Sequence, residues 1–143
     1  MSEYKLRFLE EGDYEKGYIE LLNQLTSCPK IEKNKFKDIL QKINSQSINV
    51  YVIEENNKII ATATIIYEQK FIHDGGVVAH LEDVVIDEEF RGCGLGKKMI
   101  ESIIEVVESK GCYKIICNCR ENLEKFYGRC GFERKNIQMA IYF

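Results

Sequence analysis

The sequence predicts a single α+β domain in which helices flank a central mixed, mostly antiparallel β-sheet. Two observations predict this class. Strand-like segments follow one another without an intervening helix between residues 50 and 86, as in an antiparallel meander. Helical and strand patterns alternate only in the second half of the chain. The 143 residues fit one domain, 1–143, which is long enough to bury a full core.

The first half of the chain predicts a strand, two helices and a hairpin. Tyr4 to Leu9 has the pattern of a strand, and Asp13 is the predicted N-cap of the helix that follows. In that helix apolar residues recur at helical spacing, and Cys28-Pro29 ends it; they are Tyr14, Tyr18, Leu21, Leu22 and Leu25. A second, short helix is marked by Phe36, Ile39, Leu40 and Ile43. Strands at 50–53 and 59–67 are joined by the turn sequence Glu55-Asn56-Asn57-Lys58.

The second half predicts strands alternating with helices. After a loop with Gly75-Gly76, a fourth strand runs from Val77 to Ile86. A long helix extends from about Gly94 to Lys110, with apolar residues at helical spacing. A strand at 113–119, a helix at 121–130 and a final strand from Phe132 onward, with alternating apolar residues, complete the order β-α-α-β-β-β-α-β-α-β.

The composition argues against a nucleic-acid module and against a membrane protein. The formal net charge is −3 and the lysines are spread along the chain, whereas nucleic-acid modules carry a basic surplus on one face. No apolar run approaches membrane-spanning length and the N-terminus lacks a signal-peptide core, so we expect a cytoplasmic protein. The six cysteines form no C-x-x-C pair, and the two histidines are too scattered to complete a zinc site. We therefore expect six reduced thiols and no metal.

The loop between the fourth strand and the long helix carries the strongest chemical signal. Glycines at 92, 94 and 96 leave the backbone bare where a helix N-terminus exposes unpaired N–H groups, and Arg91, Lys97 and Lys98 add positive charge. Such a place binds phosphate or pyrophosphate. The P-loop and dinucleotide patterns do not fit, whereas R-x-x-G-x-G is filled by Arg91, Gly94 and Gly96. A glycine-rich turn without a ligand is the alternative interpretation.

The R-x-x-G-x-G spacing resembles the pyrophosphate loop of the GNAT-type N-acetyltransferase superfamily, which binds acetyl-coenzyme A, and the predicted order of elements agrees with the GNAT acyl-CoA N-acyltransferase fold. Over Lys70 to Phe143 the chain is similar to the glucosamine-6-phosphate N-acetyltransferase family. The residues that carry this narrower resemblance are Lys70-Phe71-Ile72-His73, His80 to Val85, Gly111 to Ile115, Lys125-Phe126-Tyr127 and Cys130-Gly131-Phe132. Leu9 to Asp13 and Leu25-Thr26 match it as well.

The resemblance implies an activity and partners. The enzyme would transfer the acetyl group of acetyl-coenzyme A to the amine of glucosamine 6-phosphate, a step toward UDP-N-acetylglucosamine. It would be a homodimer with its sites near the subunit boundary. Two alternatives stay open: a GNAT-type enzyme for another small amine, and a non-catalytic domain that binds acetyl-coenzyme A.

Acetyl transfer needs a neutral amine, a stabilised oxyanion and a leaving thiolate. Backbone N–H groups near Val84, Val85 and Ile86 could stabilise the oxyanion if that strand diverges from its neighbour. Tyr127 is the predicted acid for the thiolate, since a phenol stays protonated at pH values where a thiol begins to ionise; packing in the core is the alternative. Glu82 is the candidate base, or it holds the amine, and as strand neighbours Glu82 and Asp83 should face opposite sides. The resemblance implies cofactor contacts at Val84, Val85, Ile86, Arg91, Gly92, Cys93, Gly94, Leu95, Gly96 and Lys97.

Substrate contacts are implied by the resemblance alone. The carried-over residues are Thr26, Lys70, Phe71, Ile72, His73, Glu82, Asp83, Tyr113, Lys114 and Asn118, while His80 is expected to be a structural hydrogen-bonding residue. Three positions depart from the family pattern. Asn118 stands where the family usually has an acid, Tyr142 stands where relatives often have a basic residue, and Asn122 lies one place earlier than the family norm.

Overall fold

The computed structural model describes residues 3–143 and confirms the α+β class. Five strands lie side by side in chain order: β1 (Leu6–Phe8), β2 (Ile48–Glu55), β3 (Lys58–Gln69), β4 (Val77–Ile86) and β5 (Lys114–Cys117). Each adjacent pair among β1 to β4 is antiparallel, and β5 runs parallel to β4. The sheet is therefore mixed and mostly antiparallel, as the sequence predicts.

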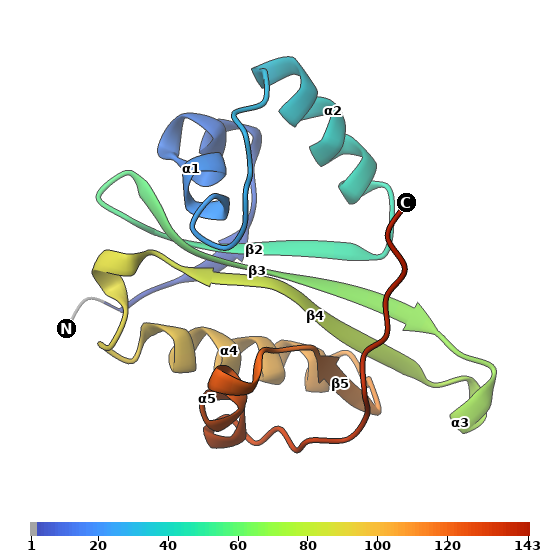
Figure 1. Cartoon of the computed structure of the whole chain (residues 1–143). Helices are drawn as coiled ribbons and strands as arrows, with labels where there is room; N and C mark the ends of the chain where they lie inside the picture. Colours follow the sequence, from blue (N-terminus) through green and yellow to red (C-terminus); the bar gives the residue numbers. More distant parts are fainter. Residues whose placement is uncertain (1–2) are drawn as a thin grey trace.

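Helices cover both faces of the sheet (Figure 1). α1 (Tyr18–Leu22) and α2 (Lys33–Asn44) lie on one face, and α4 (Leu95–Ser109) and α5 (Glu124–Arg129) lie on the other. α3 (Ile72–Gly75) is a single turn at the tip between β3 and β4, and η1 (Glu11–Lys16), η2 (Glu88–Phe90) and η3 (Glu121–Leu123) are short 3₁₀ turns. Among residues 3–143, no helix has the length and apolar character needed to cross a membrane.

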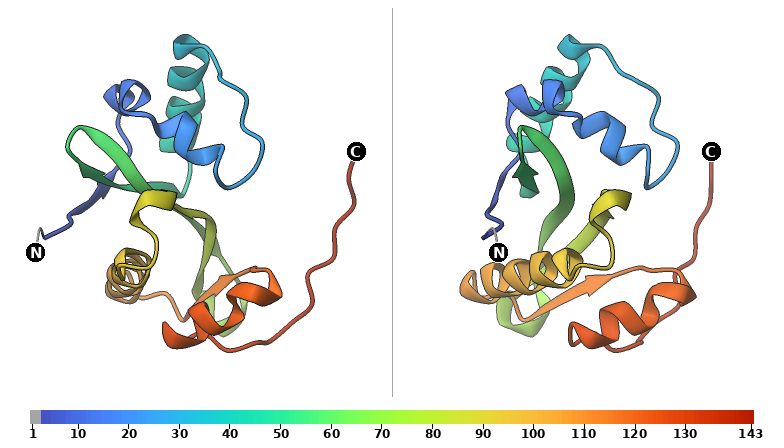
Figure 2. Two further views of the ribbon diagram at one scale, coloured as in Figure 1. Left: turned by 60° about the vertical axis from the view of Figure 1, so that its left-hand side comes forward. Right: turned by 90° about the vertical axis from the view of Figure 1, so that its left-hand side faces the viewer.

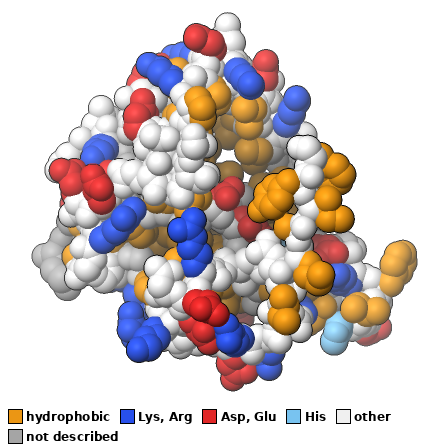
Figure 3. Space-filling model, in the orientation of Figure 1, with side chains coloured by type: hydrophobic (Ala, Val, Ile, Leu, Met, Phe, Trp, Pro, Cys, Tyr) orange, Lys and Arg blue, Asp and Glu red, His pale blue; other side chains and the backbone are white. Residues whose placement is uncertain are grey.

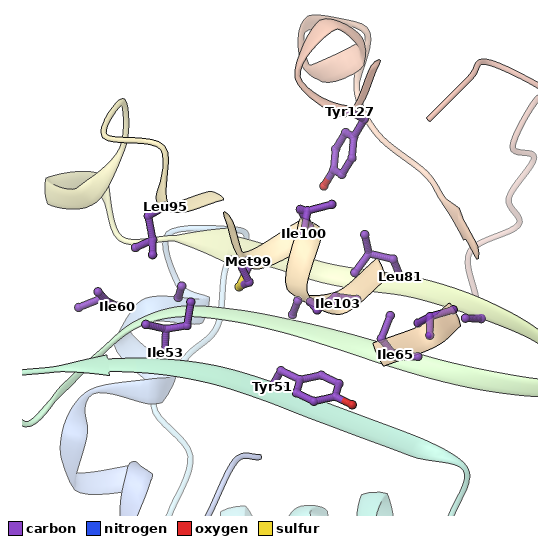
Figure 4. Close-up of a cluster of buried hydrophobic side chains, with 14 residues drawn as sticks. Tyr51, Ile53, Ile60, Ile65, Leu81, Leu95, Met99, Ile100, Ile103 and Tyr127 are labelled. Carbon is purple, nitrogen blue, oxygen red and sulfur yellow. The ribbon is translucent and has the colours of Figure 1, made fainter. Parts of the chain in front are cut away.

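Two hydrophobic cores hold these layers together. The larger lies between the sheet and α4, where Leu95, Met99, Ile100 and Ile103 meet apolar residues of the strands (Figure 4). The smaller lies between the other face and the helices α1 and α2. Because β3 is covered on both faces, its residues 59–63 are all buried, which explains their near-continuous apolar run.

Most predicted elements are present, with small shifts at their ends. β4 has the predicted bounds, and α4 begins after Gly94 and ends before Lys110. The hairpin between β2 and β3 turns at Asn56 and Asn57, which both have positive φ, as a two-residue hairpin turn requires. β5 is shorter than predicted, and the predicted helix at 121–130 begins as η3.

The prediction that Asp13 is an N-cap is wrong. Glu10 is the cap residue, and the Asp13 side chain accepts a hydrogen bond from the Glu10 N–H at 2.8 Å, inside η1. Gly17, with φ 80°, separates η1 from α1, so the predicted helix is broken in two and Leu25 lies beyond its end. Asp13 is 1% exposed because Arg7 binds both of its carboxylate oxygens at 2.8 Å. A buried ion pair with Arg7, rather than an N-cap role, thus explains why an acidic residue stands at position 13.

The predicted final strand is also absent. Residues 133–143 have no hydrogen-bonded strand partner within the described chain and stand away from the rest of the molecule (Figure 2). Their apolar side chains, at Ile137, Met139, Ile141, Tyr142 and Phe143, are exposed. A strand needs a neighbour to complete its hydrogen bonds, so alternating apolar residues alone do not make one. We refer to residues 133–143 as the C-terminal segment.

Candidate active site

The site begins where β4 diverges from β5. The two strands pair only from Val78 opposite Lys114 to Leu81 opposite Cys117, so the last five residues of β4 have no β5 neighbour. On its other side β4 carries a bulge, because Asp83 and Val84 together lie opposite a single residue of β3. Backbone N–H groups on the β5 side of this segment are therefore available to a ligand.

Two adjacent acidic residues lie at the bulge. Asp83 has φ 49°, in the left-handed region, so the strict alternation of a strand is interrupted at this residue. Both Glu82 and Asp83 line the same cleft. Glu82 raises the pKa of Cys117, which lies on the α5 side of the sheet, whereas Asp83 raises the pKa of Tyr18, which lies in α1 on the other side. These neighbours agree with the prediction that the two acidic side chains face opposite sides of β4.

A cleft of about 970 Å³ opens along the diverging strands. This volume is at the upper end of the range for small-molecule sites. The cleft collects most of the predicted cofactor and catalytic residues together with part of the predicted substrate set: Thr26, Glu82, Asp83, Val84, Val85, Ile86, Arg91, Gly92, Gly94, Gly96, Lys97, Asn118 and Tyr127.

The N-terminus of α4 forms the anion-binding end of this cleft. Gly94 caps the helix with φ 86° and no side-chain cap, and the first intrahelical bond runs from the Lys98 N–H to the Gly94 carbonyl. The preceding N–H groups of the first turn are left for a ligand. No acidic residue lies in this turn, while Arg91 and Lys97 line the cleft beside it. This arrangement suits a pyrophosphate.

Three glycines of the loop have two different roles. Gly92 and Gly94 have positive φ with open space around them, so they are needed for the backbone conformation. At Gly96 an added Cβ would lie 3.3 Å from the Phe126 ring and 3.4 Å from Ile86. Gly96 therefore allows α5 to pack closely against the start of α4. The Leu95 side chain is buried in the core, so only its backbone can serve a ligand.

A buried acid anchors the loop to the rest of the fold. Asp87 is 2% exposed, pairs with Lys58 at 2.9 Å and accepts a hydrogen bond from the Glu89 N–H at 3.0 Å. Burial raises the pKa of Asp87, but Lys58 and these hydrogen bonds outweigh it and hold the pKa below its ordinary value. Gln24, from the segment after α1, accepts a hydrogen bond from the Glu88 N–H at 2.9 Å. The anion-binding loop and the segment that carries Thr26 are thus linked directly.

Tyr127 projects from α5 toward α4, with its hydroxyl directed toward Ile100 in Figure 4. Its side chain is 7% exposed and packs edge-on against Phe126 and Phe132, yet within residues 3–143 its hydroxyl makes no hydrogen bond. Burial, together with the neighbouring thiols of Cys117, Cys119 and Cys130, raises the pKa of the Tyr127 phenol. The Tyr127 ring thus packs in the core while the residue lines the cleft, and its role as the acid stays a prediction.

Six of the predicted substrate residues lie outside the cleft; we call them the distal group: Lys70, Phe71, Ile72, His73, Tyr113 and Lys114. They gather around α3, at the far end of β4 and β5. His73 stacks on Tyr113 with ring centroids 4.2 Å apart, and Lys114 lies over the same ring. Phe71 is fully exposed. One chain therefore divides the predicted substrate residues between two places.

His80 has the structural role that the sequence predicts. Its ring nitrogen lies 2.9 Å from Glu68, and Lys70 of the distal group binds the other oxygen of Glu68 at 2.8 Å. The pKa of Glu68 is lowered by these two hydrogen bonds, so the carboxylate stays charged. Glu68 therefore holds Lys70 in place near Tyr113.

Sequence reasoning missed part of the cleft wall. The segment after β5 contributes Cys119, Arg120, Asn122 and Leu123, and the segment after α1 contributes Gln24 and Leu25. Asn122 lines the cleft in spite of its shifted position in the family motif. Arg120 directly follows the predicted strand at 113–119, and this position could have indicated a functional residue, because loops at strand ends commonly carry functional side chains. Cys93, predicted to contact the cofactor, does not line the cleft; its thiol donates to the Phe90 carbonyl.

Comparisons with known proteins agree with the resemblance seen in the sequence. The family model described as Acetyltransferase (GNAT) family matches residues 14–132. The chain is 42% identical to "Glucosamine 6-phosphate N-acetyltransferase" of Arabidopsis thaliana, over 98% of this chain and 97% of that protein. It is 41% identical to "Glucosamine 6-phosphate N-acetyltransferase 1" of Dictyostelium discoideum, over 95% of this chain and 88% of that protein.

The solved structures give the same result. The crystal structure of glucosamine-6-phosphate N-acetyltransferase from Arabidopsis thaliana superposes with a TM-score of 0.94 at 41% identity, covering 99% of both chains. The similarity therefore extends over the whole fold, including the loop, the diverging strands and α5.

Proposed function

Because the chain belongs to the GNAT family of acetyltransferases, we propose that it transfers the acetyl group of acetyl-coenzyme A to the amine of glucosamine 6-phosphate. The products are N-acetylglucosamine 6-phosphate and coenzyme A. The observation that carries the proposal is that one cleft joins an anion-binding helix N-terminus to an unpaired strand segment and a protonated, unpartnered tyrosine. Relatives about 40% identical over nearly the whole chain carry this activity in their names.

The donor groups of the cleft fit acetyl-coenzyme A. The pyrophosphate would be held by the first-turn N–H groups of α4, with Arg91 and Lys97 beside them. The thioester would lie against the unpaired part of β4, where N–H groups of Val84 to Ile86 can donate to the oxyanion that forms during transfer. When bound, the cosubstrate supplies the activated acetyl group, and the chain supplies the donors that hold it.

Two side chains would move or stabilise the reacting charges. Tyr127 donates a hydrogen bond or a proton to the departing sulfur, which its raised pKa and unpartnered hydroxyl support. Glu82, on the bulged segment, accepts a proton from the amine directly or through water, or else holds the amine in place. Either role requires that the Glu82 carboxylate face the cleft.

We further propose that the enzyme is a homodimer in which each cleft is completed by the partner's distal group. Two observations support this. The distal group has the cations suited to a sugar phosphate but lies away from the cleft of its own chain. Apolar side chains are exposed along the C-terminal segment and at α3, which form the right-hand edge of the molecule in Figure 3. Such surfaces mark protein contacts, and a strand-like segment without a partner is suited to pairing with another chain.

Mixing two inactive variants tests this arrangement. Glu82→Gln damages the cleft and Lys114→Ala damages the distal group, so neither homodimer would have a working site. After the two proteins are mixed and subunits exchange, a two-fold dimer has one intact site per heterodimer, and activity should return to about a quarter of the wild-type value. No recovery, with exchange verified by mass, would show that both residues serve the same chain's site. A chain ending at residue 132 should sediment as a monomer.

The acceptor is tested by measuring thiol release from acetyl-coenzyme A with a panel of amines. Glucosamine 6-phosphate should be used far faster than glucosamine, because the phosphate supplies binding energy through cations. Equal rates for the two sugars would exclude the sugar-phosphate assignment. Asn118 lines the cleft at a position where the family usually has an acid, and this difference favours the alternative that the acceptor is another small amine. Polyamines and amino acids therefore belong in the panel.

Cellular location and metal dependence stay predictions. All six cysteines are free, as expected for a protein in the reducing cytoplasm. Turnover should be unchanged after treatment with a metal chelator, and fractionation of cells should recover the protein with the cytosol.

A further inference from the structure

Three thiols lie near Tyr127, which lines the cleft. Cys117 ends β5, Cys119 follows two residues later and Cys130 ends α5. All three lie close enough to raise the pKa of Tyr127, and Cys119 and Cys130 act in the same way on Cys117. Sulfur atoms are therefore concentrated where the coenzyme's own sulfur is expected to lie.

The three thiols differ in accessibility. Burial raises the pKa of Cys117 to about 11 and also raises the pKa of Cys130, so these two stay protonated and are poor nucleophiles at neutral pH. Cys119 is exposed and lines the cleft. The other exposed thiol, Cys93, lies outside the cleft and donates to the Phe90 carbonyl. Cys119 is thus the accessible thiol that faces the cleft.

A second feature of the same wall points to a sulfur ligand. Tyr127 is more than nine-tenths buried, and its hydroxyl, which has no partner among the described residues, opens into the cleft. The side-chain oxygen that is fully buried without a partner among the described residues belongs to Tyr67, so the Tyr127 hydroxyl keeps some accessible surface and a free donor for a ligand in the cleft. A thiolate released beside Cys119 would be such a ligand.

We propose that Cys119 is a thiol–disulfide exchange site whose ligand is the disulfide form of coenzyme A. The inference rests on the proposed function, because the anion-binding loop is what would bring a coenzyme A disulfide into the cleft. The Cys119 thiolate attacks one sulfur of that disulfide, and a Cys119–coenzyme A disulfide forms as the original sulfur–sulfur bond breaks. The second coenzyme A leaves as a thiolate, accepts a hydrogen bond from Tyr127, and takes a proton from water. No other oxidant is needed.

The modified enzyme would be inhibited and recoverable. A coenzyme A group attached at Cys119 occupies the cleft that acetyl-coenzyme A needs, so transfer stops. Excess thiol reverses the exchange and restores the free cysteine. The enzyme would thereby respond to the oxidation state of its own cosubstrate pool.

The test uses the full chain, reduced and then incubated with coenzyme A disulfide. Mass spectrometry should find one coenzyme A on Cys119, with turnover lost in parallel and restored by dithiothreitol. Glutathione disulfide at the same concentration lacks the pyrophosphate and should react at least about ten-fold more slowly, the factor expected if the loop contributes as little as 1.4 kcal/mol of binding. Saturating acetyl-coenzyme A should protect the wild-type protein.

Two variants and one control separate the possible outcomes. Cys119→Ser should gain no adduct and, after the treatment, keep its own untreated rate, whereas Cys93→Ser should still be modified at Cys119. If Cys119→Ser does not fold, two measurements on the wild-type protein test the proposed site in its place. They are protection from modification by acetyl-coenzyme A and mapping of the cysteine that carries the adduct. An adduct on another cysteine, equal rates with glutathione disulfide, or an active enzyme that gains no adduct would overturn the inference and leave the proposed function intact. A folded protein that neither binds acetyl-coenzyme A nor releases thiol would overturn both.

Discussion

Replacing Tyr127 by phenylalanine removes one oxygen atom from the wall of the cleft. The ring would keep its edge contacts with Phe126 and Phe132, whose centroids lie 5.0 and 5.6 Å away. Since the hydroxyl makes no hydrogen bond among the described residues, its loss leaves no partner unsatisfied. The free energy of unfolding should therefore change by no more than about 0.5 kcal/mol.

The catalytic cost should be much larger than the structural one. General acid catalysis by a positioned side chain contributes about 10²- to 10⁴-fold to a rate, so kcat should fall at least about 100-fold. That factor corresponds to about 2.7 kcal/mol of lost transition-state stabilisation. The hydroxyl matters chiefly as negative charge develops on sulfur, so the KM for acetyl-coenzyme A should change by less than about three-fold.

The raised pKa of Tyr127 also predicts how the reaction rate depends on pH. Burial and the nearby thiols favour the neutral phenol, so the hydroxyl stays protonated at every pH at which the enzyme is assayed. Any loss of rate on the alkaline side, up to about pH 9, must therefore come from another group. The pH–rate profile of Tyr127→Phe should keep the wild-type shape at a lower level.

The assay is thiol release from acetyl-coenzyme A with saturating acceptor, together with calorimetric titration of acetyl-coenzyme A. Tyr67→Phe is a matched control, because the Tyr67 hydroxyl likewise makes no hydrogen bond within the described chain but is fully buried outside the cleft. Its turnover should equal the wild-type value. If Tyr127→Phe also kept kcat within three-fold, Tyr127 would be a packing residue and the acid would have to be sought elsewhere.

Three further predictions follow from other parts of the structure. Asp13→Asn should lower the free energy of unfolding by about 2 kcal/mol, since Arg7 loses its buried charged partner but keeps Glu54. In the wild type burial raises the pKa of Asp13, but the hydrogen bonds from Arg7 and the Glu10 N–H outweigh burial, so the pKa is lowered. The stability that the ionised Asp13 contributes is therefore present above about pH 4 and is lost as the pH falls further. Equal free energies of unfolding in urea titrations at pH 7 and pH 3 would contradict the assignment. Glu82→Gln should reduce kcat about 100-fold with little change in KM if Glu82 is the base, whereas a rise in KM at constant kcat would show that it only holds the amine. Gly94→Ala, at φ 86°, should cost about 1 to 2 kcal/mol of stability and weaken calorimetric binding of acetyl-coenzyme A, and unaltered binding would remove this loop from the site.

Local patterns in the sequence predicted the elements whose partners are close in the chain. The bounds of β4 and α4, and the turn at Asn56 and Asn57, follow from periodicity, glycine placement and turn residues, which act over a few positions. The same local reasoning failed at Asp13, whose carboxylate pairs with Arg7 of β1 as well as accepting from the Glu10 N–H. It failed again in the C-terminal segment, because a strand depends on a neighbour that the pattern cannot supply.

The candidate site likewise combines features that the sequence predicted with features that it did not. The anion-binding loop was predictable, since its glycines and cations are consecutive and the helix N-terminus follows directly. The bulge at Asp83 was not, because it depends on how β4 pairs with β3. Nor was the separation of the distal group from the cleft, which depends on the length over which β4 and β5 pair.

The amino-acid sequence by itself therefore determined the class of fold, the order of most elements and the chemistry of the loop before α4. Tertiary structure decided where β4 leaves β5, which side chains share the cleft, and that the Tyr127 hydroxyl is unpartnered while three thiols lie near it. The physical reason is the range of the forces. Helix periodicity and turn geometry are set by residues a few positions apart, whereas a bulge, a divergence of strands and the burial of a phenol depend on segments brought together only by folding.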